Sequence, residues 1–215
     1  VPHVVPPQGT FFIWPGLSPR GIHYAPICNG VLQPVLTWGP SCAPNPNGLA
    51  PGGWWISGQY VNTDPAAPPA FQGCHGGDRM AVQAGDELTC ELQLQSDLSW
   101  LQTVTNQTRE QQKVTYSIAL TTNGQDPQAQ NMADFVVEDP NGSSLTQAVS
   151  LYNIVARVAA PAEGLGADLQ TQRNVAGIHV NAAKTELRIE RVVVYNPIFD
   201  DHPACARLPK AATSR

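Results

Sequence analysis

A glutamate and a glutamine, each next to apolar residues, are the side chains of this chain best placed for chemistry. Glu138 ends the apolar run 135–137, and a turn follows at 140–142. A carboxyl group at the mouth of an apolar strand has its pKa raised by partial burial, towards the range useful for a general acid or base. Gln33 lies inside the apolar run 31–36, where a buried amide must find hydrogen bonds. Each residue also has a structural alternative. Glu138 could simply end a strand in solvent, and Gln33 could form hydrogen bonds with a neighbouring strand.

The elements that position these residues are predicted to be strands. Val, Ile, Thr and aromatic residues dominate the apolar runs, and turn residues separate them. Residue 34 is a proline, which lacks an N–H, so its run is an edge strand, a bulged strand or two half-strands. Residues 62–78 are predicted to be a loop. The expected strands cover 10–14, 31–38, 54–61, 80–84 up to a Gly-Asp turn, 88–95, 100–105, 113–120, 131–139, 148–158, 178–180 and 186–195.

Roughly ten short strands and no convincing helix predict an all-β fold, an antiparallel β-sandwich or jelly roll. The 215 residues are enough for one such domain, expected over 10–205. Residues 1–9 are rich in proline and are expected to form an extended arm, and residues 206–215 a loose tail.

Charge and hydropathy exclude several classes of partner. Charged residues make up 13% of the chain, the net charge is −5 and the pI is near 5.4, which argues against a nucleic-acid partner. No run of about 18 apolar residues occurs, so we expect no membrane span. We expect a monomer.

Five cysteines and two glycosylation sequons suggest a secreted, disulfide-bonded protein that begins here in its mature form. The short-loop pairings are Cys28–Cys42 and Cys74–Cys90. Cys205 would then be free, or would instead close the C-terminus onto an early loop. The cysteines form no CxxC pair, so no structural zinc is expected. The sequons place glycans on Asn106 and Asn141.

Several short segments, taken in order, resemble the fungal glutamic peptidases, or eqolisins. The segments are Ile13-Trp14-Pro15-Gly16-Leu17, Leu32-Gln33 with Trp38-Gly39, Trp54-Trp55 through Tyr60, Val82-Gln83-Ala84-Gly85-Asp86, Thr105-Asn106-Gln107-Thr108 and Ala133-Asp134-Phe135-Val136-Val137-Glu138. The last is similar to the stretch that ends in the catalytic glutamate of that family, and Leu32-Gln33 to the stretch that holds the catalytic glutamine.

The resemblance implies a concanavalin A-like jelly roll that acts as an acid endopeptidase on polypeptides. Glu138 would activate a water molecule, and Gln33 would orient that water and stabilise the oxyanion. This chemistry needs no metal or other cofactor. The side chains expected to contact substrate are Trp14, Trp38, Trp54, Trp55 and Tyr60.

Two other classes of function stay open. A carbohydrate-active sandwich (a polysaccharide lyase, glycosidase or lectin) would use an aromatic groove around Trp54, Trp55 and Tyr60. Because side chains alternate along a strand, one of Trp54 and Trp55 must face the core. The other alternative is a secreted module without catalytic activity.

Overall fold

The computed structural model describes residues 1–3, 9–19, 30–50, 52–120, 129–140, 148–167, 169 and 174–194. The fold is all-β, as expected: the described part contains twelve strands and one short 3₁₀ helix at Pro69–Phe71. All of the strand pairs are antiparallel. No helix in these ranges is long and apolar enough to cross a membrane.

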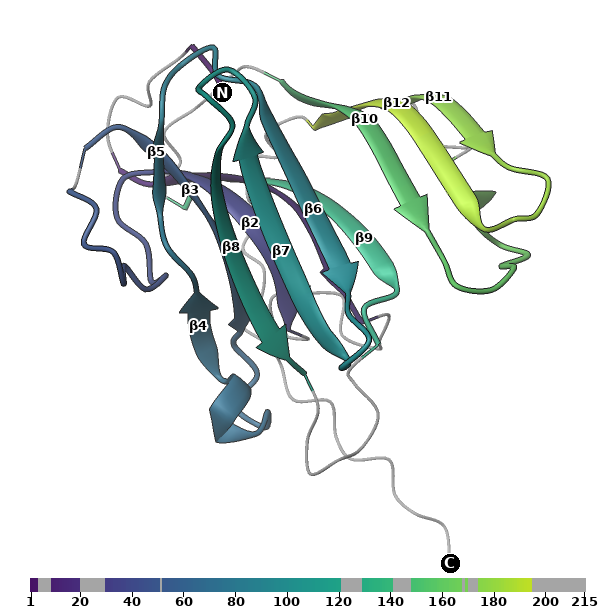
Figure 1. Ribbon diagram of the computed structural model, residues 1–215, viewed down its shortest axis with the longest axis horizontal. Helices are drawn as coiled ribbons and strands as arrows, with labels where there is room; N and C mark the ends of the chain where they lie inside the picture. Colours follow the sequence, from purple (N-terminus) through teal and green to yellow (C-terminus); the bar gives the residue numbers. More distant parts are fainter. Residues whose placement is uncertain are drawn as a thin grey trace, which may run out of the picture.

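The largest sheet has six strands in the order β4-β3-β2-β1-β9, with β5 also paired to β3 (Figure 1). This sheet carries every residue expected to do chemistry. Its strands are β1 (Phe11–Ser18), β2 (Val31–Trp38), β3 (Trp54–Asn62), β4 (Gly73–Gly76), β5 (Met80–Val82) and β9 (Met132–Glu138).

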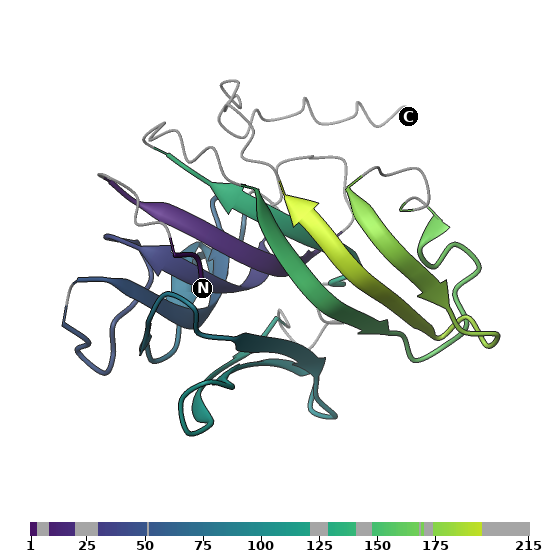
Figure 2. The same cartoon turned by 90° about the horizontal axis from the view of Figure 1, so that it is seen from above.

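Two three-stranded sheets complete the fold, in the orders β6-β7-β8 and β10-β12-β11. The first lies across one face of the large sheet, and the second extends beyond β9 (Figure 2). The molecule is therefore a β-sandwich, as the strand pattern predicted. Their strands are β6 (Leu88–Leu94), β7 (Ser99–Asn106), β8 (Gln112–Ala119), β10 (Val149–Arg157), β11 (Val175–Val180) and β12 (Glu186–Val194).

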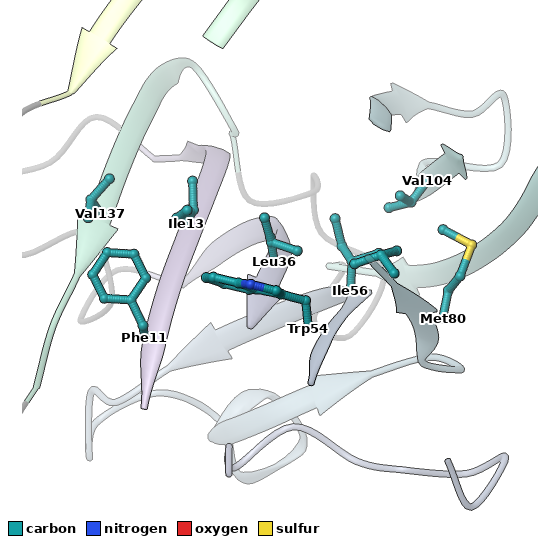
Figure 3. Close-up of a cluster of buried hydrophobic side chains, with 9 residues drawn as sticks. Phe11, Ile13, Leu36, Trp54, Ile56, Met80, Val104 and Val137 are labelled. Carbon is teal, nitrogen blue, oxygen red and sulfur yellow. The ribbon is translucent and has the colours of Figure 1, made fainter. Parts of the chain in front are cut away.

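The main core fills the space between the large sheet and β6-β7-β8. Val104 of β7 lies there in one cluster with buried side chains from five strands of the large sheet, among them Ile13, Ile56 and Val137 (Figure 3). We call the sheet face that carries these residues the inner face. Gly58 marks a close approach of the sheets, because a Cβ at this position would lie 3.0 Å from the Cβ atoms of Gln102 and Tyr116.

The edge-strand interpretation of the run with Pro34 is wrong. β2 pairs with β3 along its whole length and with β1 on its other side, so it is central. Pro34 faces Gly58 of β3, and the ladder to β1 is interrupted between the pairs Ile13–Leu36 and Leu17–Leu32. The missing N–H is therefore accommodated by a break on one side of the strand.

The predicted end of the first strand and the predicted loop 62–78 also need correction. β1 does not end at the Pro-Gly pair but continues to Ser18, because β9 pairs with it over its whole second half. The predicted loop 62–78 contains β4, which pairs with the end of β3. A four-residue strand with two glycines has no apolar alternation by which to predict it.

The predicted disulfide pairing is wrong for the cysteines that the structure describes. Cys42 bonds to Cys74, and Cys90 is a free thiol on β6. Cys74 lies on β4, so the bond joins the loop after β2 to the edge of the large sheet. Burial raises the pKa of the Cys90 thiol to about 12. Cys28 and Cys205 lie outside the described residues.

The structure contradicts the expected glycan on Asn106. Its side chain is fully buried at the end of β7, where Nδ2 donates to Asp86 Oδ2 over 2.8 Å. Its Oδ1 accepts hydrogen bonds from the backbone of Thr108 and Arg109. The amide that would carry the sugar is therefore inaccessible. The second sequon residue, Asn141, lies outside the described residues.

Asp86 is the centre of this buried polar cluster. The carboxylate is 2% exposed and pairs with Arg109 at 2.8 Å. It also accepts a hydrogen bond from the N–H of Gln83. Burial raises the pKa of Asp86, but the bonds from Gln83, Arg109 and Asn106 outweigh burial and hold that pKa below its usual range. The N-terminal arm is tied to the same turn, because Val1 accepts a hydrogen bond from Gly85.

Candidate functional site

The candidate site lies on the outer face of the large sheet, which we define as the face opposite the Ile13–Ile56 core. Side chains alternate across a strand, so Phe12, Trp14 and Gly16 of β1 share this face. Phe12 pairs with Glu138, and Gly16 pairs with Asp134. The antiparallel register thus places two carboxyl groups of β9 on one face.

Glu138 lies at the end of β9, half-buried, with its carboxyl group held by Trp14. The indole Nε1 of Trp14 donates to Glu138 Oε1 over 2.8 Å. Burial raises the pKa of Glu138 above its usual range, and the hydrogen bond from Trp14 only partly opposes this rise. The carboxyl group therefore titrates closer to the range in which it can both accept and return a proton.

Gln33 lies on the same face of β2 and is 5% exposed. It pairs with Gln59 of β3, whose side-chain Nε2 donates to Ser57 Oγ over 3.1 Å. The Oε1 atom of Gln33 is buried and accepts no hydrogen bond from the residues that the structure describes. A buried amide oxygen without a partner is uncommon and marks Gln33 as a position where a ligand can bind.

The strand register gives the backbone separation of the two expected catalytic residues. The offset of the pairs Ile13–Leu36 and Leu17–Leu32 puts Gln33 level with Gly16. Asp134 is level with Gly16 on the other side. The backbone positions of Gln33 and Asp134 thus lie about 10 Å apart, two strand spacings. The backbone of Glu138 lies about 13 Å further along β9. The backbone brings Gln33 closer to Asp134 than to Glu138.

The directions of the two side chains reduce this difference along the strands. Asp134 turns away from Glu138, because its Oδ2 accepts a hydrogen bond from Ser18 Oγ at 2.7 Å. Glu138 leans in the same direction along β9, towards the indole of Trp14, which is level with Val136, and so towards the level of Gln33. Trp14 lies on the central strand of the three, between the strands of Gln33 and Glu138. Gln33 and Glu138 therefore lie on either side of β1, the strand that carries Trp14.

Asp134 is the site residue that the sequence interpretation missed. Burial raises the pKa of its carboxyl group, and the hydrogen bond from Ser18 lowers it by less. A signal was present, since residues 134, 136 and 138 share one face of a strand with a period of two. The first acid of the run therefore had to face the same side as Glu138.

Gly16 leaves room for the Trp14 ring. A Cβ on Gly16 would lie 3.0 Å from Cε3 of that indole and 3.0 Å from Cγ1 of Val31. Any side chain here would require the indole or Val31 to shift by a few tenths of an ångström. The glycine two residues after Trp14 thus helps to set the geometry of the site.

The expected aromatic contacts divide between the two faces. Trp54 and Tyr60 are buried on the inner face, and Trp38 packs edge-on against Trp54 with ring centroids 5.6 Å apart. They cannot line a surface groove, so the proposed groove around Trp54–Tyr60 is wrong. Trp14 and Trp55 are on the outer face, where they are also buried, at 1% and 5% exposed. The Trp55 indole donates to Gly39 O over 3.2 Å.

Comparison with known proteins adds a likeness of fold only. No family model matches the chain, and no curated protein matches it. Among solved structures, aspergilloglutamic peptidase from Aspergillus niger aligns with 86% of this chain and 100% of its own, at 15% identity and a TM-score of 0.46. Similarity at this level carries no functional argument, so the assignment of a function depends on the residues of the outer face.

The arrangement supplies proton transfer and amide hydrogen bonding. In the described ranges, no three His, Cys, Asp or Glu side chains gather closely enough to hold a metal ion. Those ranges offer two carboxyl groups with raised pKa values and a buried amide on one sheet face. Such groups can activate water and stabilise an oxyanion.

Proposed function

We propose that the chain is an acid endopeptidase of the glutamic type, with Glu138 and Gln33 as its catalytic pair. The observation that carries the proposal is their joint placement on one face: a carboxyl with a raised pKa, and a buried amide oxygen that accepts no hydrogen bond from the described residues. The resemblance in sequence order around both residues points to the same pair.

Each residue has a defined step in the reaction. Ionised Glu138 accepts a proton from a water molecule as the water oxygen attacks the peptide carbonyl carbon. Gln33 Oε1 accepts a hydrogen bond from the other O–H of the water. Gln33 Nε2 donates a hydrogen bond to the peptide carbonyl oxygen, which becomes negative. Glu138 then returns the proton to the amide nitrogen, and the C–N bond breaks to give an acid and an amine.

Trp14 acts as a positioning residue in this scheme. Its N–H group fixes the direction of the Glu138 carboxylate and favours the ionised form. Without it, burial alone would keep the carboxyl protonated to a higher pH. The scheme therefore predicts activity at acid pH, where the carboxyl groups of the site titrate.

The proposal extends to location and substrate. The Cys42–Cys74 disulfide is compatible with an oxidising compartment, and we propose a secreted monomer that cleaves polypeptides. A polysaccharide substrate has less support, because Trp54 and Tyr60 are enclosed in the core.

The test is hydrolysis of a denatured protein between about pH 2 and 6. Glu138→Gln should abolish activity while the circular dichroism spectrum stays unchanged. Asp134→Asn is the matched control, since it removes a carboxyl group from the same face of the same strand. We expect this control to keep measurable activity. The assignment of Glu138 is wrong if Asp134→Asn is the inactive variant, and the function is wrong if the wild type cleaves nothing.

A further inference from the structure

The strand β11 is the last strand of the sheet β10-β12-β11 and leaves one of its edges open. It pairs with β12 on one side, and no strand in the described part of the chain pairs with its other side. Figure 1 shows β11 at the opposite end of the molecule from β5. Proteins usually protect an open edge with lysine or proline. The β11 sequence, Val-Ala-Gly-Ile-His-Val, contains neither residue.

One hydrogen bond shows which backbone groups of β11 point away from β12. The N–H of Asn181 donates to Glu186 O over 3.0 Å, so Asn181 faces β12. Such bonds involve every second residue of an antiparallel pair. His179 therefore also faces β12 with its backbone, whereas Ile178 and Val180 direct their N–H and C=O groups to the open edge. A strand added at this edge can make four backbone hydrogen bonds there.

The side chains at the open edge differ between the two faces of the sheet. Ile178 and Val180 pack against the buried cluster around Leu187. His179 is exposed on the other face and pairs with Arg188 of β12. Each residue of an added strand would lie beside the β11 residue with which it pairs. The residues opposite Ile178 and Val180 would therefore extend an apolar cluster, and the residue between them would face His179.

The exposed face next to the edge favours a negatively charged residue at that middle position. Arg188 lies one strand in from the edge, and its side chain is 60% exposed. Glu186 pairs with Arg188 at 2.7 Å and also with Arg157 at 2.8 Å, so two arginines share one carboxylate. The carboxyl group of Glu190 lies over Gly177 and so beside a different position of an added strand.

A second copy of this chain fits the edge poorly. If two copies of β11 exchanged the backbone bonds of Ile178 and Val180, His179 would lie opposite its own copy, with one Arg188 on each side. Like charges directly opposite each other in a sheet are destabilising. The occupant that fits is a different polypeptide, with an acidic residue in the middle.

We propose that the open edge of β11 binds an extended polypeptide segment of the pattern apolar–acidic–apolar, which adds to the sheet as a fourth, antiparallel strand. The acidic residue faces His179 and Arg188, and the two apolar residues lie beside Ile178 and Val180. The partner is thus a protein that exposes such a segment. This docking site is independent of the proposed activity, because β11 carries none of the residues assigned to catalysis.

The test is binding of the dye-labelled peptide Thr-Thr-Val-Glu-Val-Thr-Thr to the full chain, measured by fluorescence anisotropy. At about pH 7 the glutamate of the peptide is ionised. The same peptide with lysine in place of glutamate is the matched probe. His179→Glu reverses the charge preference of the edge, and Ser117→Glu, at an exposed position of β8, is the control for the added charge. Amide hydrogen exchange of Ile178 and Val180 locates the bound strand.

We expect the glutamate peptide to bind the wild type and Ser117→Glu, and to slow the exchange of both amides. His179→Glu should weaken this binding by about 2–30-fold, the range for replacing an attractive cross-strand charge pair with a repulsive one, and should favour the lysine peptide. Val180→Pro removes one outward N–H and leaves the bonds to β12 in place, so it should abolish binding even if His179→Glu does not fold.

Three results would overturn the docking site. The first is equal binding of the two peptides by the wild type, or no binding at about 1 mM peptide. The second is protection of amides in another strand instead of Ile178 and Val180. The third is self-association of the wild type through this edge, in competition with the peptide. None of these results bears on peptide cleavage, so the proposed function stands or fails separately.

Discussion

Replacing Trp14 with phenylalanine tests whether the indole N–H tunes the pKa of Glu138. The variant keeps an aromatic ring on the outer face but removes the donor that lies 2.8 Å from Glu138 Oε1. This bond favours the ionised carboxylate, so its loss should raise the pKa of Glu138 beyond the rise that burial already causes.

The size of the shift follows from the energy of a hydrogen bond to a charged group. Such a bond contributes about 1.5–3 kcal/mol. Because Glu138 is only half-buried, we take the lower end, and about 1.5 kcal/mol corresponds to about one pKa unit. Catalysis needs Glu138 ionised, so the acid limb of kcat/KM should move about one unit to higher pH.

The assay is the pH dependence of kcat/KM on a fluorogenic peptide between about pH 2 and 7. Trp55→Phe is the control, because its indole lies on the same face but donates to the neutral carbonyl of Gly39. Its acid limb should match that of the wild type. An unchanged acid limb in Trp14→Phe, or a shift to lower pH, would refute the role of Trp14 and weaken the assignment of Glu138 as the base.

Two further predictions concern stability. Asp86→Asn should reduce the free energy of unfolding near neutral pH by about 2 kcal/mol, less than for a fully buried pair because Arg109 is 38% exposed. The folded-state pKa of Asp86 is lowered, so its contribution is present above the unfolded value of about 3.9 and disappears as the pH falls through the folded one. Urea unfolding from about pH 2 to 7 should therefore show a flatter pH dependence in the variant, and parallel curves would contradict this. Replacing Cys42 and Cys74 together with serine should cost about 3–4 kcal/mol, from the chain entropy of a loop with a sequence separation of 32. Thermal unfolding measures this loss, and an unchanged melting temperature would show that the bond does not form in solution.

Local pattern was enough to predict the strands. The alternation along Leu88–Leu94 and the paired runs that form β7 and β8 are properties of neighbouring residues, which repeat with a period of two. The alternation along β3 likewise predicted that Trp54 and Trp55 face opposite sides, as they do. The all-β class follows from these local preferences.

The faces of β9 were also determined by its own residues. Because Asp134 and Glu138 are separated by an even number of positions, they share one side in any strand that contains both. Glu138 and Gln33 could be proposed from their apolar surroundings alone. The buried state of Gln33 agrees with that proposal.

Contacts between distant segments required the tertiary structure. The register of β1 against β2 and β9 decides that Gln33 is level with Asp134, and the side-chain bonds of Trp14 and Ser18 decide where the two carboxyl groups turn. The contacts between β1 and β9 join residues more than a hundred positions apart, and those between β1 and β2 join residues 15 to 27 positions apart, so no local pattern encodes them.

The cysteines and the sequon show the same limit. Spacing favoured short loops, but Cys42 bonds to Cys74 because β4 returns along β3 and brings it to the loop after β2. Asn106 lies in a glycosylation sequon, yet its side-chain amide donates a hydrogen bond to the buried Asp86. Sequence alone determined which residues are strand-forming, which share a face and which could do chemistry. Only the packing of distant strands, driven by burial of the shared core, decided which of them meet.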